Sequence, residues 1–518
     1  MAQSVAGAAI VLMIMNMMAR LLGFVRETAI AGIFGATALT DAYQVAYTLP
    51  YFLQMVLGTA LVSSIVPVVI RKISEEKKEE AWRIASITMN WTAVLMAALT
   101  AVGMVGARYL VAVTAPGFQG ETEAMAVQMT VIMFPSIIFM GVGMLMTGIL
   151  NARQKFAVAA AAPAISSLII ILGVLLAGRS NPLALPAATL LSFMGFMLIQ
   201  VPALRKTGFR YTFSFDLTNP QVRGIFANLL PIFIGTATYQ IYLAINRFFA
   251  SGLAEGSISA LNYASKLMNL PLGIFVSAIS SAIFPLLAAQ AMEKDRSLLM
   301  GSLNKGLKLV LLVTLPAAAG LMALRVPIVQ LLFERGAFHH EATLMTASAL
   351  LWFGPGMGAM AASQVLTRSY YAMGDARTPL WMGLASIGVN ILASMVFMPY
   401  FAQGGLALAN STASLFNALG MYALLSRHIQ QRQGKDLLAT LSKTLLASVG
   451  TGLAAWGVYG VSAGWLSGFG NSLQAIGRTG LAILAGVAVY ALGLLVLREN
   501  VLGEFAGQLK RPKKKSIV

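Results

Sequence analysis

Long apolar stretches recur along the whole chain, and only short polar connections separate them. A helix needs about 18 to 20 apolar residues to cross about 30 Å of hydrocarbon, and the pattern predicts about fourteen such helices. They are expected near residues 7–34, 41–70, 84–113, 122–150, 156–178, 182–204, 222–250, 257–290, 303–327, 341–372, 378–400, 405–426, 438–461 and 478–498. The pattern therefore indicates an all-α polytopic membrane protein.

The composition supports lipid as the solvent of this chain. Of its 518 residues, 58% are hydrophobic and 10% are charged, whereas soluble domains contain about 25% charged residues. Cysteine is absent and three histidines are present, so we expect neither a metal site nor a cofactor. The sequence also lacks a phosphate-binding loop, a nucleophile elbow and a zinc-protease helix. We therefore expect no catalytic residue and no enzymatic activity, and we expect a coupling ion, the membrane potential or the substrate's own gradient to drive transport.

Basic residues concentrate in alternate connections. The formal net charge is +18, and most lysines and arginines lie on one side if the N-terminus is cytoplasmic. The basic connections are 71–83, 151–156, 205–210, 292–296, 373–378 and 426–435, together with a tail at 501–518. This distribution predicts cytoplasmic N- and C-termini. Because the basic connections would face anionic membrane lipids, the positive net charge is explained without a nucleic-acid partner, and we expect none.

An internal repeat divides the predicted helices. TDAYQVAYTLP (40–50) resembles LNYASKLMNLP (261–271), and LNARQKF (150–156) resembles MGDARTP (373–379), at a spacing of about 220 residues. We therefore predict two six-helix lobes, at 1–204 and 205–426, with two further helices in 427–500. Lobes of even helix number keep the same orientation, and a central cavity between them is expected.

Four charged residues in the first two predicted helices stand out: Arg20, Arg26, Glu27 and Asp41. An arginine at the centre of a membrane helix costs about 2.5–3.5 kcal/mol on insertion scales, so such a residue suggests function. The alternative is that Arg26 and Glu27 lie at a helix end and that Arg20 reaches the interface along its apolar stem.

Arg247 and Lys266 are the matching cations in the second predicted lobe. A cavity lined by cations with few carboxylates suits an anion, and guanidinium groups suit phosphate oxygens in particular. Arg247 could instead be an interfacial anchor near a helix end. Together these residues predict a cationic cavity that binds a phosphate-bearing substrate.

Several segments resemble the MurJ/MviN lipid II flippases of the MOP transporter superfamily. They are ARLLGFVRE (19–27), FGATALTDAYQVAYTLP (34–50), ISALNYASKLMNLPLG (258–273), FERGAF (333–338), YAMGDARTP (371–379) and GGLALANS (404–411). The resemblance implies a fold of fourteen helices in two lobes. It also implies movement of undecaprenyl-pyrophosphate-linked muropeptide from the inner to the outer leaflet by alternating access.

The resemblance also implies roles for individual residues. The family's functional charges on the first helix fall on Arg20, Arg26 and Glu27, and its acidic TDA residue falls on Asp41. Two positions depart from the family. Gln54 stands where an arginine is common, and Lys266 replaces an arginine, keeping the charge without the bidentate fork. The resemblance therefore implies pyrophosphate binding by Arg20, Arg26, Lys266 and Arg247, with Glu27, Asp41 and Gln54 in support.

Three other functions stay open from the sequence. The first is a flippase for another polyprenyl-linked saccharide, such as a capsule unit. The second is a multidrug antiporter of the MATE type, although a cavity for cationic drugs should present carboxylates. The third is a non-transporting membrane scaffold for wall synthesis.

Overall fold

The structure is a computed structural model that describes the backbone of residues 5–498, apart from 179, 228, 294–296, 430–433 and 466–469. Side chains are described for the same residues except 5–13, 49, 54, 230–240, 428, 429, 434, 435, 465, 471 and 472. Within these ranges the chain forms helices and no strand, so the predicted all-α class is confirmed. The predicted basic tail at 501–518 lies outside the described residues.

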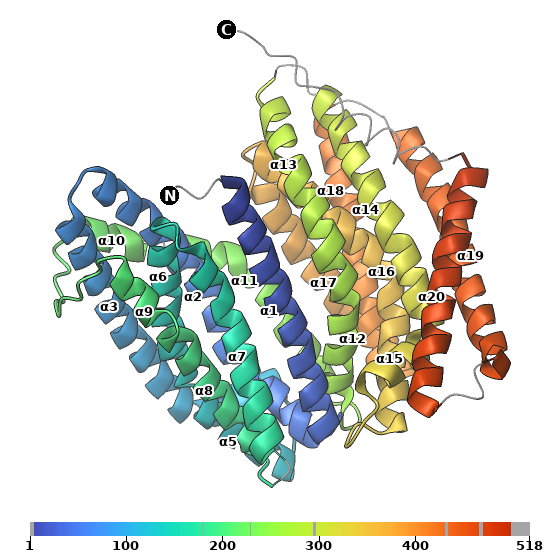
Figure 1. The fold of residues 1–518 in the computed structure, drawn as a ribbon, viewed down its shortest axis with the longest axis horizontal. Helices are drawn as coiled ribbons and strands as arrows, with labels where there is room; N and C mark the ends of the chain where they lie inside the picture. Colours follow the sequence, from blue (N-terminus) through green and yellow to red (C-terminus); the bar gives the residue numbers. More distant parts are fainter. Residues whose placement is uncertain are drawn as a thin grey trace. The chain divides into compact units, whose positions relative to one another are not determined.

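The first half of the chain forms α1 to α11 (Figure 1). Their bounds are α1 Val5–Phe34, α2 Ala38–Ser74, α3 Lys78–Val105, α4 Ala107–Thr114, α5 Gly120–Met133, α6 Ser136–Ala152, α7 Phe156–Ala177, α8 Ala184–Leu198, α9 Val201–Lys206, α10 Pro220–Ala227 and α11 Leu229–Ala250.

The second half continues with α12 to α20, including one short π-helix, η1. Their bounds are α12 Ser257–Pro271, η1 Leu272–Val276, α13 Ser277–Ala291, α14 Ser297–Ala323, α15 Arg325–Phe333, α16 His340–Ala372, α17 Arg377–Phe401, α18 Gln403–Ile429, α19 Gly434–Trp465 and α20 Asn471–Val496.

Each predicted apolar stretch is occupied by helix, but several contain two or three successive helices. Residues 84–113 hold the end of α3 and most of α4, and residues 122–150 hold most of α5 and α6, which bend by 40° at their junction. Within the described residues, ten helices are long and apolar enough to cross a membrane, or up to eleven with the bent pair. The protein is therefore a multi-pass membrane protein, and the number of fourteen spans stays a prediction.

The chain divides into two compact units by its contacts. Unit 1 is Met1–Ser259 with Arg335–Ala342, and unit 2 is Ala260–Glu334 with Thr343–Val518. Residues 335–342 join unit 1 because the Ala337 N–H donates a 2.9 Å hydrogen bond to the Gly32 carbonyl on α1. The predicted division into lobes at 1–204 and 205–426 concerns the repeat and stays a prediction.

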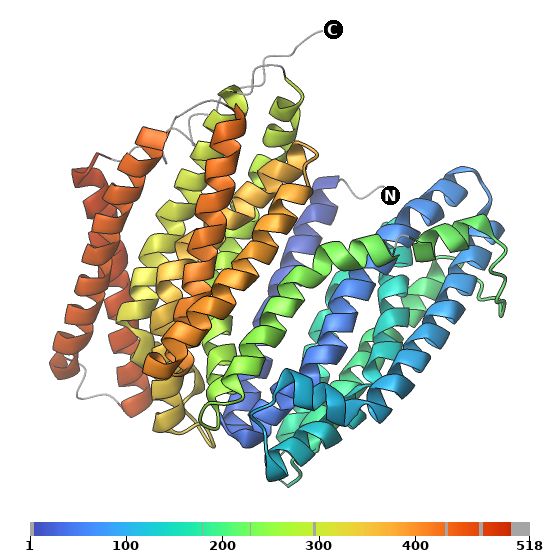
Figure 2. The ribbon, with the colours of Figure 1, turned by 180° about the vertical axis from the view of Figure 1, so that it is seen from behind.

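Unit 1 is built around α2. The helices α5, α6 and α11 pack on α2, while α7 lies between α1 and α8 (Figures 1 and 2). One apolar core joins α2, α3 and α6 through fully buried Ile65, Ile84 and Leu145. Apolar burial of this kind contributes about 25 cal/mol per Å² when the reference is water. In lipid, close packing between helices supplies much of the stabilisation instead, and small and branched residues such as those found here allow such packing.

Unit 2 contains two tight helix pairs, α17 with α18 and α19 with α20. The α19–α20 pair packs on α14 through Leu309, Leu312, Ala447 and Leu494. The Tyr490 hydroxyl of α20 donates a 2.6 Å hydrogen bond to the Leu312 carbonyl. The two helices predicted within 427–500 are thus part of this unit's packing.

The two halves of the sequence repeat differ in local backbone. Pro50 lies inside the continuous helix α2, whereas Pro271 ends α12 and is followed by the π-helix η1. A π-turn is a known site of helix irregularity. The same Leu-Pro pattern is therefore followed by α-helix in one repeat and by a π-helical turn, within a continuous helical segment, in the other.

Candidate functional site

Arg26 and Glu27 form an ion pair inside α1. The Arg26 Nη2 atom lies 2.7 Å from the Glu27 Oε1 atom, and the Glu27 side chain is 6% exposed. α1 continues to Phe34, two turns beyond this pair. The alternative interpretation, in which these charges lie at a helix end, is therefore wrong. A charge-assisted hydrogen bond offsets part of the cost of keeping both groups away from water.

Three tyrosines on α2 form a stacked row beside this pair. Tyr43, Tyr47 and Tyr51 are spaced four residues apart, with ring centroids 5.9 Å and 5.3 Å apart. Residues at this spacing share one face of a helix. Arg26 lies close enough to Tyr43 and Tyr47 for its charge to act on their hydroxyl groups. The row therefore gives the arginine an amphipathic wall that combines aromatic faces with hydroxyl groups.

The α8 helix closes the other side of the tyrosine row. Phe193 stacks on Tyr47 with a centroid separation of 6.5 Å. The hydroxyls of Tyr43 and Thr189 are hydrogen-bonded at 3.0 Å. Packing and hydrogen bonding together fix the orientation of the tyrosine rings.

Arg247 reaches the same region from the last turn of α11. Its guanidinium donates a hydrogen bond to the hydroxyl of Thr48, the residue after Tyr47 on α2. Arg247 thus lies near a helix end, and both interpretations from the sequence, a substrate-binding cation and an interfacial anchor, stay predictions. We call Arg26, Glu27, Tyr43, Tyr47 and Arg247 the arginine–tyrosine cluster.

Asp41 is engaged by the start of α12. Its Oδ2 atom accepts a 2.8 Å hydrogen bond from the Gly256 N–H, and its Oδ1 atom accepts bonds from the Ser259 N–H at 2.8 Å and hydroxyl at 2.6 Å. The side chain is buried, with 3% of the residue exposed. A carboxylate at a helix N-terminus satisfies N–H groups that lack helical partners and complements the helix dipole. Asp41 therefore acts structurally here, by capping α12 from another helix.

Three predicted residues are not part of the arginine–tyrosine cluster as defined: Arg20, Lys266 and Gln54. Arg20 lies six residues before Arg26 on α1, about 9 Å along the helix axis, and is exposed. Lys266 lies on α12 within unit 2 and is half-buried. The side chain of Gln54 lies outside the described residues. The roles predicted for these three residues stay predictions.

The arginine–tyrosine cluster contains two guanidinium groups and one carboxylate. Arg26 has five N–H donors, and Glu27 takes one of them in the ion pair. An incoming phosphate could engage further donors in the bidentate geometry that guanidinium favours. The arrangement is suited to binding an anion that also carries apolar or sugar surface.

Sequence reasoning missed the tyrosine row and Thr189. The spacing of Tyr43, Tyr47 and Tyr51 was a usable signal, since it places three amphipathic side chains on the face of α2. Thr189 carried no such signal, because its bond to Tyr43 joins residues 146 positions apart. Among the described residues, no group of three or more metal-ligating side chains is found.

Comparison with known sequences gives concordant matches. The model of the family described as lipid II flippase MurJ matches residues 30–474. The lipid II flippase MurJ of Burkholderia cenocepacia is 28% identical over 420 residues, which cover 79% of this chain and 81% of that protein.

Comparison with solved structures agrees with the sequence matches. A lipid II flippase MurJ in an inward closed conformation matches with a TM-score of 0.77 and 25% identity, covering 95% of this chain and 100% of that one. An inward-facing MATE family multidrug transporter of the MOP superfamily matches with a TM-score of 0.67 at 16% identity, covering 82% of this chain and 98% of that one. The second match concerns the fold alone.

Proposed function

Because this chain belongs to the MurJ family of lipid II flippases, we propose that it moves lipid II, an undecaprenyl-pyrophosphate-linked muropeptide, from the inner to the outer leaflet of a membrane. The headgroup of such a lipid is charged and polar, so its unaided passage through hydrocarbon carries a large desolvation cost. A membrane protein lowers that cost by offering a polar path while the polyprenyl tail stays in the bilayer.

The arginine–tyrosine cluster supports this proposal most directly. Arg26 pairs with Glu27, and Arg247 bonds to Thr48, the residue after Tyr47, so two guanidinium groups lie near the tyrosine row within unit 1. Pyrophosphate binds guanidinium groups through paired hydrogen bonds, and tyrosine faces and hydroxyls suit the sugar and the start of the tail. A multidrug antiporter for cations would require the opposite charge at this position.

Glu27 makes the binding of pyrophosphate to the arginine–tyrosine cluster reversible. When no substrate is present, Glu27 neutralises Arg26 at 2.7 Å. Pyrophosphate competes with this carboxylate for the guanidinium and leaves when the pair re-forms. A site that must release its substrate on the far side needs such an internal competitor, since very tight binding would slow turnover.

The two remaining predicted cations, Arg20 and Lys266, are also part of the proposal. Arg20 lies two turns before the arginine–tyrosine cluster on α1, and Lys266 lies on α12. We propose that both contact the headgroup at other steps of transport by alternating access. The energy source is a coupling ion, the membrane potential or the substrate gradient.

The location of the protein follows from its charge pattern as a further part of the proposal. The basic connections at 71–83 and 205–210 lie on the side that the positive-inside rule assigns to the cytoplasm. We therefore place the protein in the bacterial inner membrane with both termini in the cytoplasm.

Complementation of a strain depleted of its own lipid II flippase tests the proposal. We expect wild type and Arg26→Lys to support growth, the second weakly, and Arg26→Ala to fail at equal membrane levels. Thr59→Ala serves as a matched control on α2, since its hydroxyl bonds only to the carbonyl of its own helix. Failure of well-expressed wild type to rescue growth, with rescue of a capsule-flippase mutant instead, would redirect the proposal to another polyprenyl-linked saccharide.

A further inference from the structure

An extended segment, residues 208–219, joins α9 to α10 and runs along α3 in unit 1. Near its start the ring of Phe209 packs edge-on against Trp82 at 5.5 Å, and further along Phe215 packs edge-on against Trp91 at 5.7 Å. Nine residues of helix separate the two tryptophans, about 13 Å along the axis. The 208–219 segment therefore lies beside the first half of a helix that is long and apolar enough to span the membrane.

Side chains of α3 satisfy the backbone of this extended segment. Asn90 donates to the Ser214 carbonyl at 2.9 Å and accepts from the Tyr211 hydroxyl at 2.6 Å. Trp91 donates to the Phe215 carbonyl at 3.1 Å. Extended backbone near hydrocarbon is tolerated only when its polar groups find partners within the protein. These bonds therefore suit a segment held at the depth of the membrane interface.

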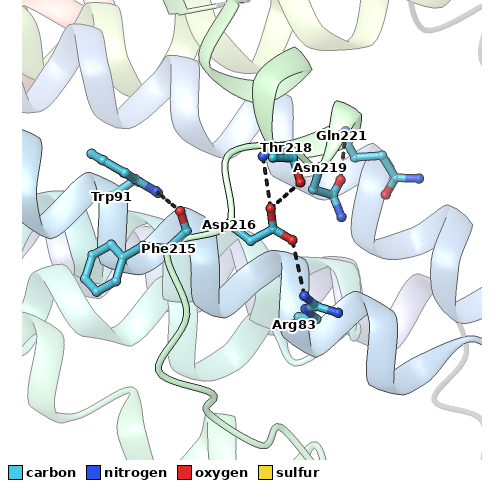
Figure 3. Close-up of polar contacts among 7 residues, drawn as sticks. All are labelled: Arg83, Trp91, Phe215, Asp216, Thr218, Asn219 and Gln221. Atoms are coloured by element: carbon cyan, nitrogen blue, oxygen red, sulfur yellow. Dashed lines mark hydrogen bonds and ion pairs between the residues drawn. The ribbon is translucent and has the colours of Figure 1, made fainter.

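Asp216 fixes the end of the 208–219 segment, as Figure 3 shows. Its Oδ2 atom lies 3.2 Å from the Arg83 Nη2 atom, and its Oδ1 atom accepts a 3.0 Å bond from the Thr218 N–H. Asn219 then accepts the Gln221 N–H at 2.9 Å and leads into α10. Side-chain hydrogen bonds and an ion pair thus hold the end of the 208–219 segment against α3 and lead it into α10.

Beyond this turn an open apolar pocket lies between α3, the 208–219 segment and α10. Its volume is about 390 Å³, and it is lined by Trp91, Leu95, Leu217, Arg223 and Phe226. This volume is within the range of about 300–1,000 Å³ that small-molecule sites occupy. Four of its five lining residues are apolar, and the fifth is a cation.

The surroundings of the pocket are suited to a membrane interface. Phe213 is 79% exposed and Tyr211 is 55% exposed, and aromatic residues concentrate at the level of lipid headgroups. The stretch 201–227 contains four basic residues (Arg205, Lys206, Arg210 and Arg223) and one acidic residue, Asp216. Because Arg83 already pairs with Asp216, the charge left near the pocket is positive.

We propose that this pocket binds one anionic glycerophospholipid of the adjacent leaflet, with an acyl chain against Trp91, Leu95 and Phe226 and its phosphate on Arg223. Arg223 is exposed at the pocket, and within the part of the chain that the structure describes no carboxylate forms an ion pair with it. Apolar lining beside a guanidinium matches the two ends of a phospholipid, whereas a soluble anion would leave the apolar surface uncovered. The pocket shares no residue with the arginine–tyrosine cluster.

Photocrosslinking in vesicles tests this site. Full-length protein with a photoreactive residue in place of Leu217 is reconstituted in equal amounts of phosphatidylethanolamine and phosphatidylglycerol, and the crosslinked lipids are identified by mass spectrometry. We expect phosphatidylglycerol to be enriched about fivefold at this position, the ratio expected for one basic residue near a membrane surface. The matched control is the same group in place of Leu176 on α7, which is 84% exposed and should report the bulk ratio.

Two variants separate charge from packing. Arg223→Gln should lower the enrichment toward the bulk ratio while lipid adducts persist, and Arg223→Lys should retain most of it. Leu95→Trp should fill the pocket and reduce adducts of both lipids. Equal lipid ratios at Leu217 and Leu176 would overturn the proposal, as would adducts at Leu217 that are mainly protein or polyprenyl lipid.

Discussion

At the scale of residues, the protein gives charged groups on its apolar helices ion-pair or hydrogen-bond partners. Arg26 pairs with its neighbour Glu27, Arg247 bonds to Thr48, and Asp41 caps a helix that lies elsewhere in the sequence. Each arrangement lowers the cost of a charge away from water. The first two also place guanidinium groups near the tyrosine row, which is where the proposed function needs them.

A double replacement separates the stability of the Arg26–Glu27 pair from its function. Arg26→Gln and Glu27→Gln should each lower the free energy of unfolding by about 1–3 kcal/mol, because each leaves the other residue's charge partly buried without its partner. The double variant should regain much of that stability, since neither charge is left without a partner. It should still fail in complementation, because the cation for pyrophosphate is gone. Growth of the double variant at wild-type rate would show that the pair has only a structural role.

Asp41 is expected to act through α12 rather than through substrate. Asp41→Asn keeps the shape but removes the negative charge at the helix N-terminus, so it should lower stability by about 1–2 kcal/mol. Ser259→Ala removes one of the bonds to Asp41 and should have a smaller effect in the same direction. Thermal melting of both purified variants measures this order. The opposite order of the two melting temperatures would count against capping as the main role.

At the scale of elements, side chains that lie far apart in sequence fix the irregular parts of the chain. The 208–219 segment depends on Ser86, Asn90 and Trp91 of α3. α12 depends on Asp41 of α2. Regular helices satisfy their own backbone in lipid, so these side-chain bonds are concentrated where the helices stop.

The turn at Asp216 should stay folded over a wide range of pH. Hydrogen bonds from the Thr218 hydroxyl and N–H, with the charge of Arg83, lower the pKa of Asp216 below its usual value. A carboxyl group whose pKa is lowered by folding stabilises the folded state at pH values above its pKa in the unfolded chain, which is about 3.9. That stabilisation is lost only as the pH falls through its pKa in the folded protein. Protection of the Thr218 amide in hydrogen exchange, corrected for intrinsic rate, should therefore stay constant from about pH 8 to 5.

Asp216→Asn provides the matched comparison for that experiment. It should reduce protection at Thr218 at every pH, because the amide is a weaker acceptor and loses the attraction of Arg83. A wild-type segment that loses protection near neutral pH would contradict the role assigned to this carboxylate.

At the scale of the whole molecule, the apolar pattern was sufficient to predict where helix occurs. Each predicted stretch is helical because about 20 apolar residues leave few alternatives in lipid. The breaks were harder to predict. α5 and α6 separate around Phe134 and Pro135, and a proline inside an apolar stretch is equally compatible with a continuous helix, as Pro50 in α2 demonstrates.

The candidate site was predictable in part for the same reason. Charges in apolar stretches are visible in the sequence, so Arg26, Glu27 and Arg247 could be named. Their partners could not. The bond from Gly256 to Asp41 spans 215 positions and the bond from Arg247 to Thr48 spans 199. Contacts at such separation depend on how helices pack, which the pattern along one helix does not specify.

Direct observation of lipid II movement tests the central claim. Full-length protein is reconstituted in vesicles with fluorescent lipid II, and a membrane-impermeant quencher reports how much of the label becomes accessible with time, with and without a membrane potential. We predict that wild type transfers the protected pool and that the Arg26→Gln, Glu27→Gln double variant does not, although it is folded. Transfer by folded wild type no faster than in protein-free vesicles, under both conditions, would contradict the account.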